Sequence, residues 1–355
     1  MTLEEVETEG SRSPLLRLLA FLGPDYTLFF LFLFALLALG ASYGQHWRFK
    51  EGPIYLSALA ALTMVFVRLA ADARAIVTDS GNARRDFVAA ASRILRDWGP
   101  LFLVAIVFEN LEIYTGLIRK APIDDLLYRI DLAVFGVEPT VWFSHFDIGI
   151  LADYFALAYA LYLITPLVLA VFLLARGRRD DFREMSTAVI IQMCLGFVLF
   201  LVFPAGPPRF YEPLVSGGLG GFDPPHLHSL FGLYEFQQGS FDTVDPLIIR
   251  SAFPSLHCSL GLLTIIYGHR FSEAVWPRFP RLYARVATVL AVSLWLSTIY
   301  LRHHWVPDCL AGMAVGAFAC WASPLLRKHW PEVAAVRSVR GRTPAETIAT
   351  AQPRA

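Results

Sequence analysis

The chain has 355 residues, of which 56% are hydrophobic and only 17% are charged. A soluble domain usually carries about 45–50% apolar and about 25% charged residues, so this composition indicates a polytopic membrane protein. The 30 basic and 30 acidic residues cancel, which excludes the overall basic field that draws a protein to nucleic acid. Four Cys in a chain of this length exclude a secreted disulfide scaffold.

Eight segments are apolar for long enough to cross a bilayer, which takes about 20 residues. They cover residues 26–44, 53–71, 99–118, 151–175, 185–204, 253–271, 283–301 and 307–326. None of them alternates with the period of two that a membrane barrel requires, so we expect helices. The sequence therefore predicts an all-α fold, a bundle of about eight transmembrane helices.

The segment between the third and fourth spans has a different pattern. From Asp124 to Phe146 it carries apolar and aromatic residues at mixed helical spacing, interrupted by Gly136 and Pro139. Such a pattern is typical of an amphipathic segment that lies in the membrane interface with aromatic anchors. We expect this segment, within residues 123–150, on the outer face.

The distribution of Lys and Arg predicts the orientation, because cytoplasmic loops of membrane proteins are enriched in them. With the N-terminus in the cytoplasm, the inner segments hold 21 of the 30 basic residues, the outer segments hold eight, and Arg68 lies within a span. We therefore expect both termini in the cytoplasm, with loops 119–150 and 205–252 and turn 302–306 outside. The first 25 residues lack the pattern of a cleavable signal peptide, and none is expected.

Three polar pieces of the sequence fall where predicted spans meet the outer surface. The first runs from Gly206 to Tyr211, the second from Phe253 to His257, and the third from Ser297 to Asp308. The spans were assigned from hydropathy and orientation from charge, so the common level of the three pieces is an independent indication of a shared site.

These pieces offer the groups that phosphoryl transfer needs. A helix that begins near Ser255 presents unpaired N–H groups to an anion, and the Ser255 hydroxyl and the Arg209 guanidinium can add contacts to phosphate oxygens. His304 can act as a nucleophile if a carboxylate holds its other nitrogen, and Asp308 follows it by four residues. His257 can then protonate the leaving oxygen and later deprotonate the acceptor.

The three pieces resemble the type-2 phosphatidic acid phosphatase superfamily. Its pattern is a first motif with Arg, a second motif Pro-Ser-x-His, and a third with Ser, then His, then Asp four residues later. Pro-Ser-Leu-His at 254–257 and His-His-Trp at 303–305 look like the inositol phosphorylceramide synthase branch.

The resemblance implies a division of the chain into three parts. Residues 99–326 correspond to a six-helix catalytic core that includes the interfacial segment 123–150 and the outer loop 205–252. Residues 1–98 add two further spans. Residues 327–355 form a cytoplasmic tail rich in Arg, Thr and Ala, which we expect to be disordered.

The resemblance also implies a function, namely lipid phosphotransfer at the outer face through a phosphohistidine. The substrate is then a phospholipid or other lipid phosphate, whose inositol-phosphate-like head group moves to an alcohol acceptor, with inositol or another polyol as a further partner. A lipid phosphate phosphatase of the same superfamily is the alternative. A non-enzymatic lipid transporter is less favoured, because we find no inverted repeat and no broken helices meeting at the midplane. No metal or other cofactor is implied.

Two positions depart from the superfamily pattern. Thr298 stands where an Arg usually follows the third-motif Ser, and the Lys usually found upstream of Arg209 is absent. We therefore expect phosphate binding to depend on Arg209 and Ser255, with Arg302 or Arg250 as possible replacements for the missing cations.

Three other histidines have alternative explanations. We expect His303 to be a neighbour of the nucleophile, because the four-residue step to the carboxylate starts at the next residue. His226 and His228 form a His-x-His pattern that could bind metal. Their Pro-rich polar loop explains them better.

Four further residues are ambiguous in the same way. Glu109 and Glu112 lie one turn apart in the third span, where charges are costly, and an ion pair with Arg68 is favoured over head-group recognition. Cys258 and Cys309 each follow a motif residue, so a disulfide is chemically possible. Small apolar packing is favoured instead.

Overall fold

The chain is described from a computed structural model. The described residues are 14–44, 83–111, 114–143, 145–146, 148–211, 229–242 and 250–330. Within these ranges the secondary structure is helical, apart from one isolated bridge between Ala205 and Ser251. The predicted all-α class is therefore confirmed.

Five helical segments of the described part are long and apolar enough to cross a membrane. They are Leu18–Ser42, Gly149–Ala175, Arg179–Val202, Pro280–Tyr300 and Val306–His329. The protein is therefore an integral, multi-pass membrane protein.

Helices occupy each predicted span that falls within the described ranges. They are α2 (Pro14–Ser42), α4 (Ala83–Asn110), α7 (Gly149–Ala160) with η2 (Leu161–Leu163) and α8 (Ile164–Ala175), α9 (Arg179–Val202), α12 (Leu256–Arg270), α14 (Pro280–Tyr300) and α15 (Val306–His329). The predicted span 53–71 lies outside the described residues. The count of eight spans and the six-helix core stay predictions.

Helix α4 differs most from its prediction. We expected it to begin close to Pro100, whereas it begins at Ala83 and contains Pro100 as an internal residue. The part of α4 before Pro100 is too polar for a hydropathy criterion, yet Ile94, Asp97 and Trp98 in it are buried. Asp97 is buried there and pairs with Arg179 at 3.1 Å and Arg183 at 3.3 Å on helix α9. The predicted boundary between the N-terminal part and the core thus falls inside a helix.

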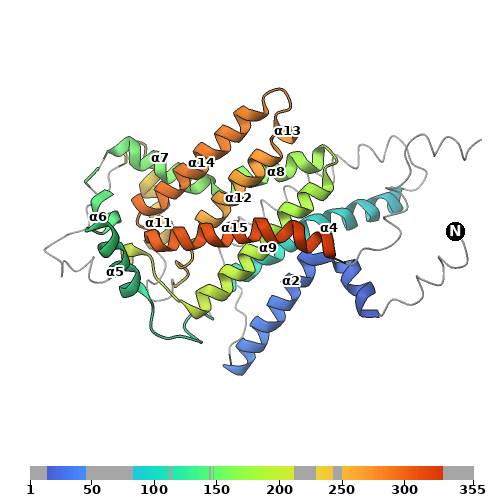
Figure 1. Cartoon of the computed structure of the whole chain (residues 1–355), viewed down its shortest axis with the longest axis horizontal. Helices are drawn as coiled ribbons and strands as arrows, with labels where there is room; N and C mark the ends of the chain where they lie inside the picture. Colours follow the sequence, from blue (N-terminus) through green and yellow to red (C-terminus); the bar gives the residue numbers. More distant parts are fainter. Residues whose placement is uncertain are drawn as a thin grey trace, which may run out of the picture.

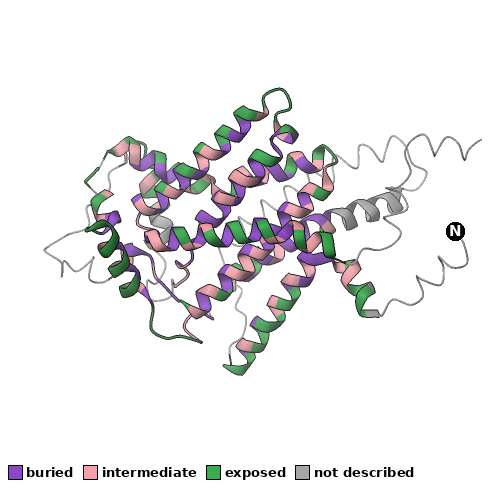
Figure 2. Ribbon diagram, viewed as in Figure 1, coloured by how far each residue is buried: buried purple, intermediate pink, exposed green. Residues whose placement is uncertain are grey.

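Helix α12 lies in the middle of the bundle, with α14 and α15 packed along it and α9 packed against α15 (Figure 1). Buried residues line the facing sides of these helices, and exposed residues lie on the outside (Figure 2). Many of the exposed residues are large and apolar, such as Leu310 and Trp321 on α15. This distribution suits a bundle surrounded by hydrocarbon, in which apolar surface carries no hydration cost.

The starts of α12 and α15 cross at backbone contact. A Cβ atom at Gly312 would lie 2.0 Å from the Ser255 carbonyl oxygen, and one at Gly316 would lie 2.6 Å from the Ser259 carbonyl oxygen. Small residues four apart allow two membrane helices to approach this closely. The Ser255 N–H donates to the carbonyl oxygen of Asp308 at 2.9 Å. The two helices are thereby fixed relative to one another.

Short helices cover one end of the bundle, at the left of Figure 1, which we call the motif end. They are α5 (Asp124–Phe135) and α6 (Pro139–Phe143), from the predicted interfacial segment, and α11 (Leu233–Asp242). Asp153 on α7 holds the start of α11, because it accepts bonds from the Ser229 hydroxyl and from the backbone N–H groups of residues 230, 231, 233 and 234. Helices α5 and α6 thus fall within the predicted amphipathic segment, and its position in the membrane interface stays a prediction.

Some predictions concern residues outside the described part. They include Arg68 and Glu112, the side chain of Glu109, and His226 and His228. Of the predicted tail, residues 327–329 belong to α15, and residues 331–355 lie outside the described part.

Candidate active site

The three polar pieces of the sequence meet at the motif end. The first contacts the third, because Arg209 Nη2 donates to the carbonyl oxygen of Leu301 at 2.7 Å. The first also runs beside the second, because the Ala252 N–H donates to the carbonyl oxygen of Ala205 at 2.9 Å. The second and third are joined by the crossing of α12 and α15. Segments that are distant in sequence therefore form one site.

Helix α14 ends in a turn that positions the two histidines of the third piece. The His303 N–H donates to the Thr298 carbonyl oxygen at 2.8 Å and the Arg302 N–H to that of Ile299 at 2.9 Å, which is the Schellman pattern. Arg302 takes the left-handed position with φ 59°, where glycine is usual. This conformation costs about 1 kcal/mol or more. It reverses the direction of the chain directly before His303 and His304.

His304 lies between a carboxylate and a second imidazole. Its Nδ1 is 3.5 Å from Asp308 Oδ2, and its Nε2 is 3.2 Å from His257 Nδ1. Asp308 is fully buried and His304 is 5% exposed. Asp308 Oδ2 also accepts the Trp305 N–H at 3.1 Å, so the carboxylate is held by the first turn of α15 while it faces the ring. The 3.5 Å contact is an ion-pair distance, longer than a hydrogen bond.

Burial keeps the histidines of the third piece neutral. It lowers the pKa of His304 from its ordinary value of 6.5 to about 4, and the Arg209 cation acts in the same direction. Burial, with Arg209, also holds the pKa of His303 well below the ordinary value. A neutral imidazole has a lone pair on one ring nitrogen. His304 is therefore in the state that a nucleophile requires at neutral pH.

Two tyrosines from the fourth span surround His257, and sequence reasoning missed both. The ring centroids of Tyr159 and Tyr162 each lie 4.5 Å from that of His257. Tyr159 also stacks on His303 at 4.3 Å. These tyrosines resemble ordinary aromatic bulk in an apolar span, so no local pattern marked them.

Arg209 reaches the site beside His303. Its Nη2 lies 3.0 Å from His303 Nδ1 and 3.1 Å from Nε2. Arg209, the first-motif Arg, therefore contacts His303, the residue that precedes the candidate nucleophile His304. This places a delocalised cation at the motif end, with the fork geometry that matches phosphate oxygens.

Ser255 and Thr298 lie behind the histidines and are fully buried. Ser255 Oγ accepts the Cys258 N–H at 3.3 Å, which makes it the N-cap of α12. The Thr298 hydroxyl donates to the Trp295 carbonyl oxygen at 2.7 Å and lies 3.4 Å from the sulfur of Cys309. Both cysteines are free thiols, in agreement with the packing that we favoured for them.

The two replacement cations face other groups. Arg250 Nη1 donates to the Lys120 carbonyl oxygen at 2.6 Å. Arg302 is near enough to the Glu138 carboxylate for the two charges to attract each other. The structure thus brings His257, His304 and Asp308 together with Arg209 nearby, and it directs Arg250 towards the loop at residue 120.

Helix α5 attaches to the site through a buried acid, Asp131, which the sequence did not mark. Its Oδ2 accepts the N–H of Val306, the first residue of α15, at 3.2 Å, and the residue is 1% exposed. Burial raises its pKa to about 7, and the Glu138 and Asp308 carboxylates act in the same direction. Polar residues of an amphipathic segment usually face water, so this acid was not expected inside.

A sequence profile of the PAP2 superfamily, the phosphatase superfamily named above, matches residues 127–322. The match covers more than half of the chain and contains all three polar pieces. The chain belongs to the PAP2 superfamily. The predicted membership of this superfamily and the predicted likeness to the inositol phosphorylceramide synthase branch are confirmed.

Curated relatives of this PAP2 protein are named as synthases. It is 30% identical over 158 residues to inositol phosphorylceramide synthase of Candida albicans, covering 41% of this chain and 30% of that protein. It is 24% identical over 206 residues to phosphoinositol dihydroceramide synthase of Bacteroides thetaiotaomicron, covering 53% and 63%. It is 29% identical over 136 residues to the inositol phosphorylceramide synthase catalytic subunit of Schizosaccharomyces pombe, covering 36% and 28%.

The chain therefore aligns with less than two thirds of the length of each of these relatives. No solved structure matches the chain.

The attachment of α5 predicts a pH-dependent stability. An acid whose pKa is raised on folding binds more protons in the folded state than in the unfolded state. Its contribution to the free energy of unfolding is therefore fully favourable below about pH 4 and is lost as the pH rises to about 7. Asp131→Asn keeps an acceptor for the Val306 N–H and cannot ionise. We expect its thermal unfolding midpoint, relative to wild type, to rise between pH 4 and pH 7 and then stay constant. Glu273→Gln, at an exposed position, is the control, and a pH-independent difference for Asp131→Asn would contradict the assignment.

Proposed function

We propose that the protein is a membrane-embedded lipid phosphotransferase. It moves an inositol-phosphate-like head group from a phospholipid to an alcohol acceptor through a phosphohistidine at His304. The observation that carries this proposal is the arrangement of buried Asp308, buried His304 and half-buried His257, in which the His304 ring faces a carboxylate on one side and a second imidazole on the other. The names of the relatives support the direction of transfer, because all three are synthases.

In the first step, neutral His304 attacks phosphorus through Nε2, the nitrogen that faces His257. A phosphorus–nitrogen bond forms, and the bond from phosphorus to the oxygen of the departing lipid alcohol breaks. His257 takes up a proton when the anionic phosphate binds beside it, and it gives this proton to that oxygen. Asp308 holds the ring orientation and stabilises the positive charge that develops on His304.

In the second step, His257 takes the proton from the hydroxyl of the acceptor. The acceptor oxygen attacks phosphorus, the phosphorus–nitrogen bond breaks, and His304 returns to its neutral form. Attack by a lipid alcohol gives a synthase, whereas attack by water gives a phosphatase. We propose the alcohol, because the second and third motifs resemble the synthase branch.

The phosphate oxygens are held by Arg209 and by the unpaired N–H groups in the first turn of α12, with the Ser255 hydroxyl beside them. Thr298 supplies no cation, and its buried hydroxyl is bonded to the chain behind it. Arg302 lies near Glu138 and Arg250 bonds to Lys120, so we propose for them only secondary contacts. Arg209 then provides most of the positive charge.

We further propose that both termini are cytoplasmic and that the site faces the extracytoplasmic side, as the distribution of Lys and Arg indicates. Phe231 lies at the motif end and Arg176 between α8 and α9, and both are exposed. Phe231→Cys should react with an impermeant thiol reagent on intact cells, and Arg176→Cys only after permeabilisation. The reverse pattern would overturn the proposed side.

The proposed reaction predicts where a labelled head group goes. In vesicles that contain the purified protein, head-group-labelled phosphatidylinositol and a ceramide, we expect the label in a new sphingolipid, with one diacylglycerol released per transfer. His304→Ala should lower the rate about 10³-fold or more, because it removes the nucleophile. His303→Ala is the matched control and should keep a larger share of the activity.

Two results would contradict the proposal. Label found only in water-soluble inositol phosphate, with the ceramide unused, would identify a hydrolase. Loss of activity in His303→Ala together with activity in His304→Ala would move the nucleophile to the neighbouring ring.

A further inference from the structure

Two tyrosines of the fourth span pack against His257, the proposed proton donor. The ring centroid of Tyr159 lies 4.5 Å from that of His257, with an angle of 32° between the ring planes. The ring centroid of Tyr162 lies at the same distance, with an angle of 58°. The two tyrosine rings are 6.2 Å apart. One short segment of the fourth span therefore presents two aromatic rings to a single imidazole.

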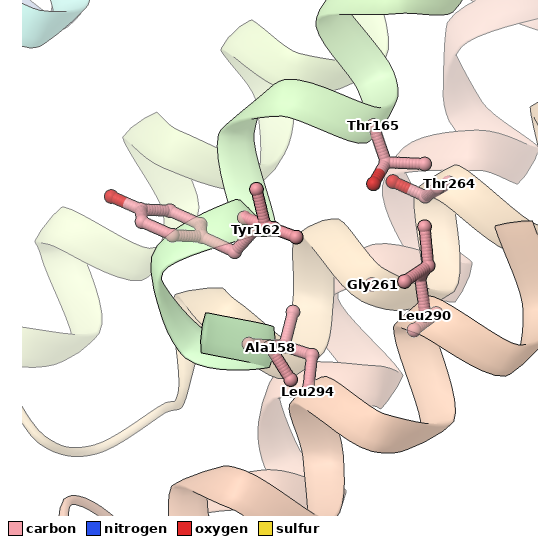
Figure 3. Close-up of a pocket in the computed structure, with 9 residues that line it drawn as sticks. Ala158, Tyr162, Thr165, Gly261, Thr264, Leu290 and Leu294 are labelled. Atoms are coloured by element: carbon pink, nitrogen blue, oxygen red, sulfur yellow. The ribbon is translucent and has the colours of Figure 1, made fainter. Parts of the chain in front are cut away.

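The break in the fourth span gives these tyrosines their common direction. Tyr159 lies in the last turn of α7, and Tyr162 lies in the 3₁₀ turn η2 (Leu161–Leu163). Side chains three residues apart eclipse one another in a 3₁₀ turn, whereas they are offset in an α-helix. Figure 3 shows the ring of Tyr162 pointing away from the small cavity that Thr165 and Thr264 help to line. The ring is thus free of the cavity and packs on His257.

The tyrosines contact a ring that must carry a positive charge to act as an acid. Within the described part of the chain, the titratable side chains in contact with His257 are neutral His304, from the start of α15, and the two tyrosines. Asp308 is on the far side of His304, and α9 and α14 bring no charged group into contact with the ring.

The aromatic faces can stabilise that charge. The face of an aromatic ring carries partial negative charge, and it attracts a cation that lies within about 6 Å of the ring centroid. Both tyrosine centroids are inside this range. They favour the protonated form of His257 without adding a carboxylate, which would repel the phosphate of a substrate.

Tyr159 also connects the proton donor to the rest of the site. It stacks on His303 with a centroid distance of 4.3 Å and an angle of 23°. His303 in turn contacts Arg209 and precedes His304, whose ring centroid is 5.4 Å from that of His257. One aromatic ring therefore packs against both the donor and the residue next to the nucleophile.

We propose that Tyr159 and Tyr162 are positioning residues for the proton donor. They hold the His257 ring in the orientation that reaches the leaving oxygen, and their faces stabilise its protonated form when phosphate is bound. The proposal rests on the proposed function and deepens it, because it gives the broken fourth span a part in proton transfer. The role belongs to the aromatic rings and does not need the hydroxyls.

Substitutions that keep or remove one ring test this role. We expect Tyr162→Phe to keep most of the activity, whereas Tyr162→Leu should lower kcat at pH 7 about tenfold. Tyr159→Leu should act in the same direction if Tyr162→Leu does not fold. The control is Tyr154→Leu, which removes an exposed tyrosine of the same helix whose hydroxyl contacts Ser293 on α14. This control should keep the pH profile of the wild type.

The pH profile separates this role from a structural one. Because the rings stabilise the charged imidazole, removing one lets the proton leave at a lower pH. The alkaline limb of kcat, which reports the acid in the enzyme–substrate complex, should therefore move about one pH unit lower in Tyr162→Leu. A loss of activity that is equal at every pH would overturn the proposal.

A substrate whose leaving group needs no proton is the second test. In an inositol phosphodiester with nitrophenol in place of diacylglycerol, the departing oxygen leaves without help from an acid. We expect Tyr162→Leu to match the wild type with this ester and to be impaired about tenfold with phosphatidylinositol. An equal impairment with both substrates would overturn the proposal.

A third measurement needs no turnover. In detergent-solubilised protein with ¹⁵N-labelled histidine and inorganic phosphate, the NMR signal of His257 is assigned by its loss in His257→Ala. Its titration should occur at lower pH in Tyr162→Leu than in the wild type or in Tyr154→Leu. This shift in a protein that transfers no head group would support the role of the tyrosines and reject the proposed function. An unchanged titration would overturn the proposal even where transfer occurs.

Discussion

The close crossing of α12 and α15 is the constraint on which the rest of the site depends. Glycines at 312 and 316 let the backbones touch, and the Ser255 N–H closes the contact with the Asp308 carbonyl oxygen. His257 lies in the first turn of one helix, His304 lies just before the other helix, and Asp308 lies in the first turn of that other helix. Any side chain at these glycines would separate the helices. The distance between the two imidazoles is therefore set by backbone packing, with little freedom for the side chains themselves.

Burial determines the protonation state of His304 within this geometry. Taking His304 out of water lowers its pKa to about 4, so its lone pair is present at neutral pH without a base to remove a proton. The same burial strengthens the electrostatic interaction between the Asp308 carboxylate and the His304 ring, because charges interact more strongly where water is excluded. Arg209 lies beside His303, the residue that precedes His304. The site thus combines a neutral imidazole, a fixed carboxylate and a guanidinium cation within a membrane bundle.

The sequence predicted the parts of the site that depend on local spacing. The four-residue step from His304 to Asp308 and the helix start at Ser255 follow from helical geometry, and the structure places these residues together. It could not predict Tyr162 or Asp131, because each is defined by a contact with a distant segment. Hydropathy also misplaced the start of α4, a helix whose buried Asp97 pairs with two arginines of α9. Tertiary contacts decided each of these cases.

The central claim is a covalent bond between His304 and phosphorus. The most direct measurement is to give the protein a phosphorus-labelled phospholipid without an acceptor, stop the reaction in alkali, and map the labelled peptide by mass spectrometry. The account predicts an acid-labile, alkali-stable label on His304 that persists in His303→Ala, is absent in His304→Ala and disappears when ceramide is added. Transfer that proceeds at a normal rate with no label on the protein, or with the label on another residue, would contradict the account.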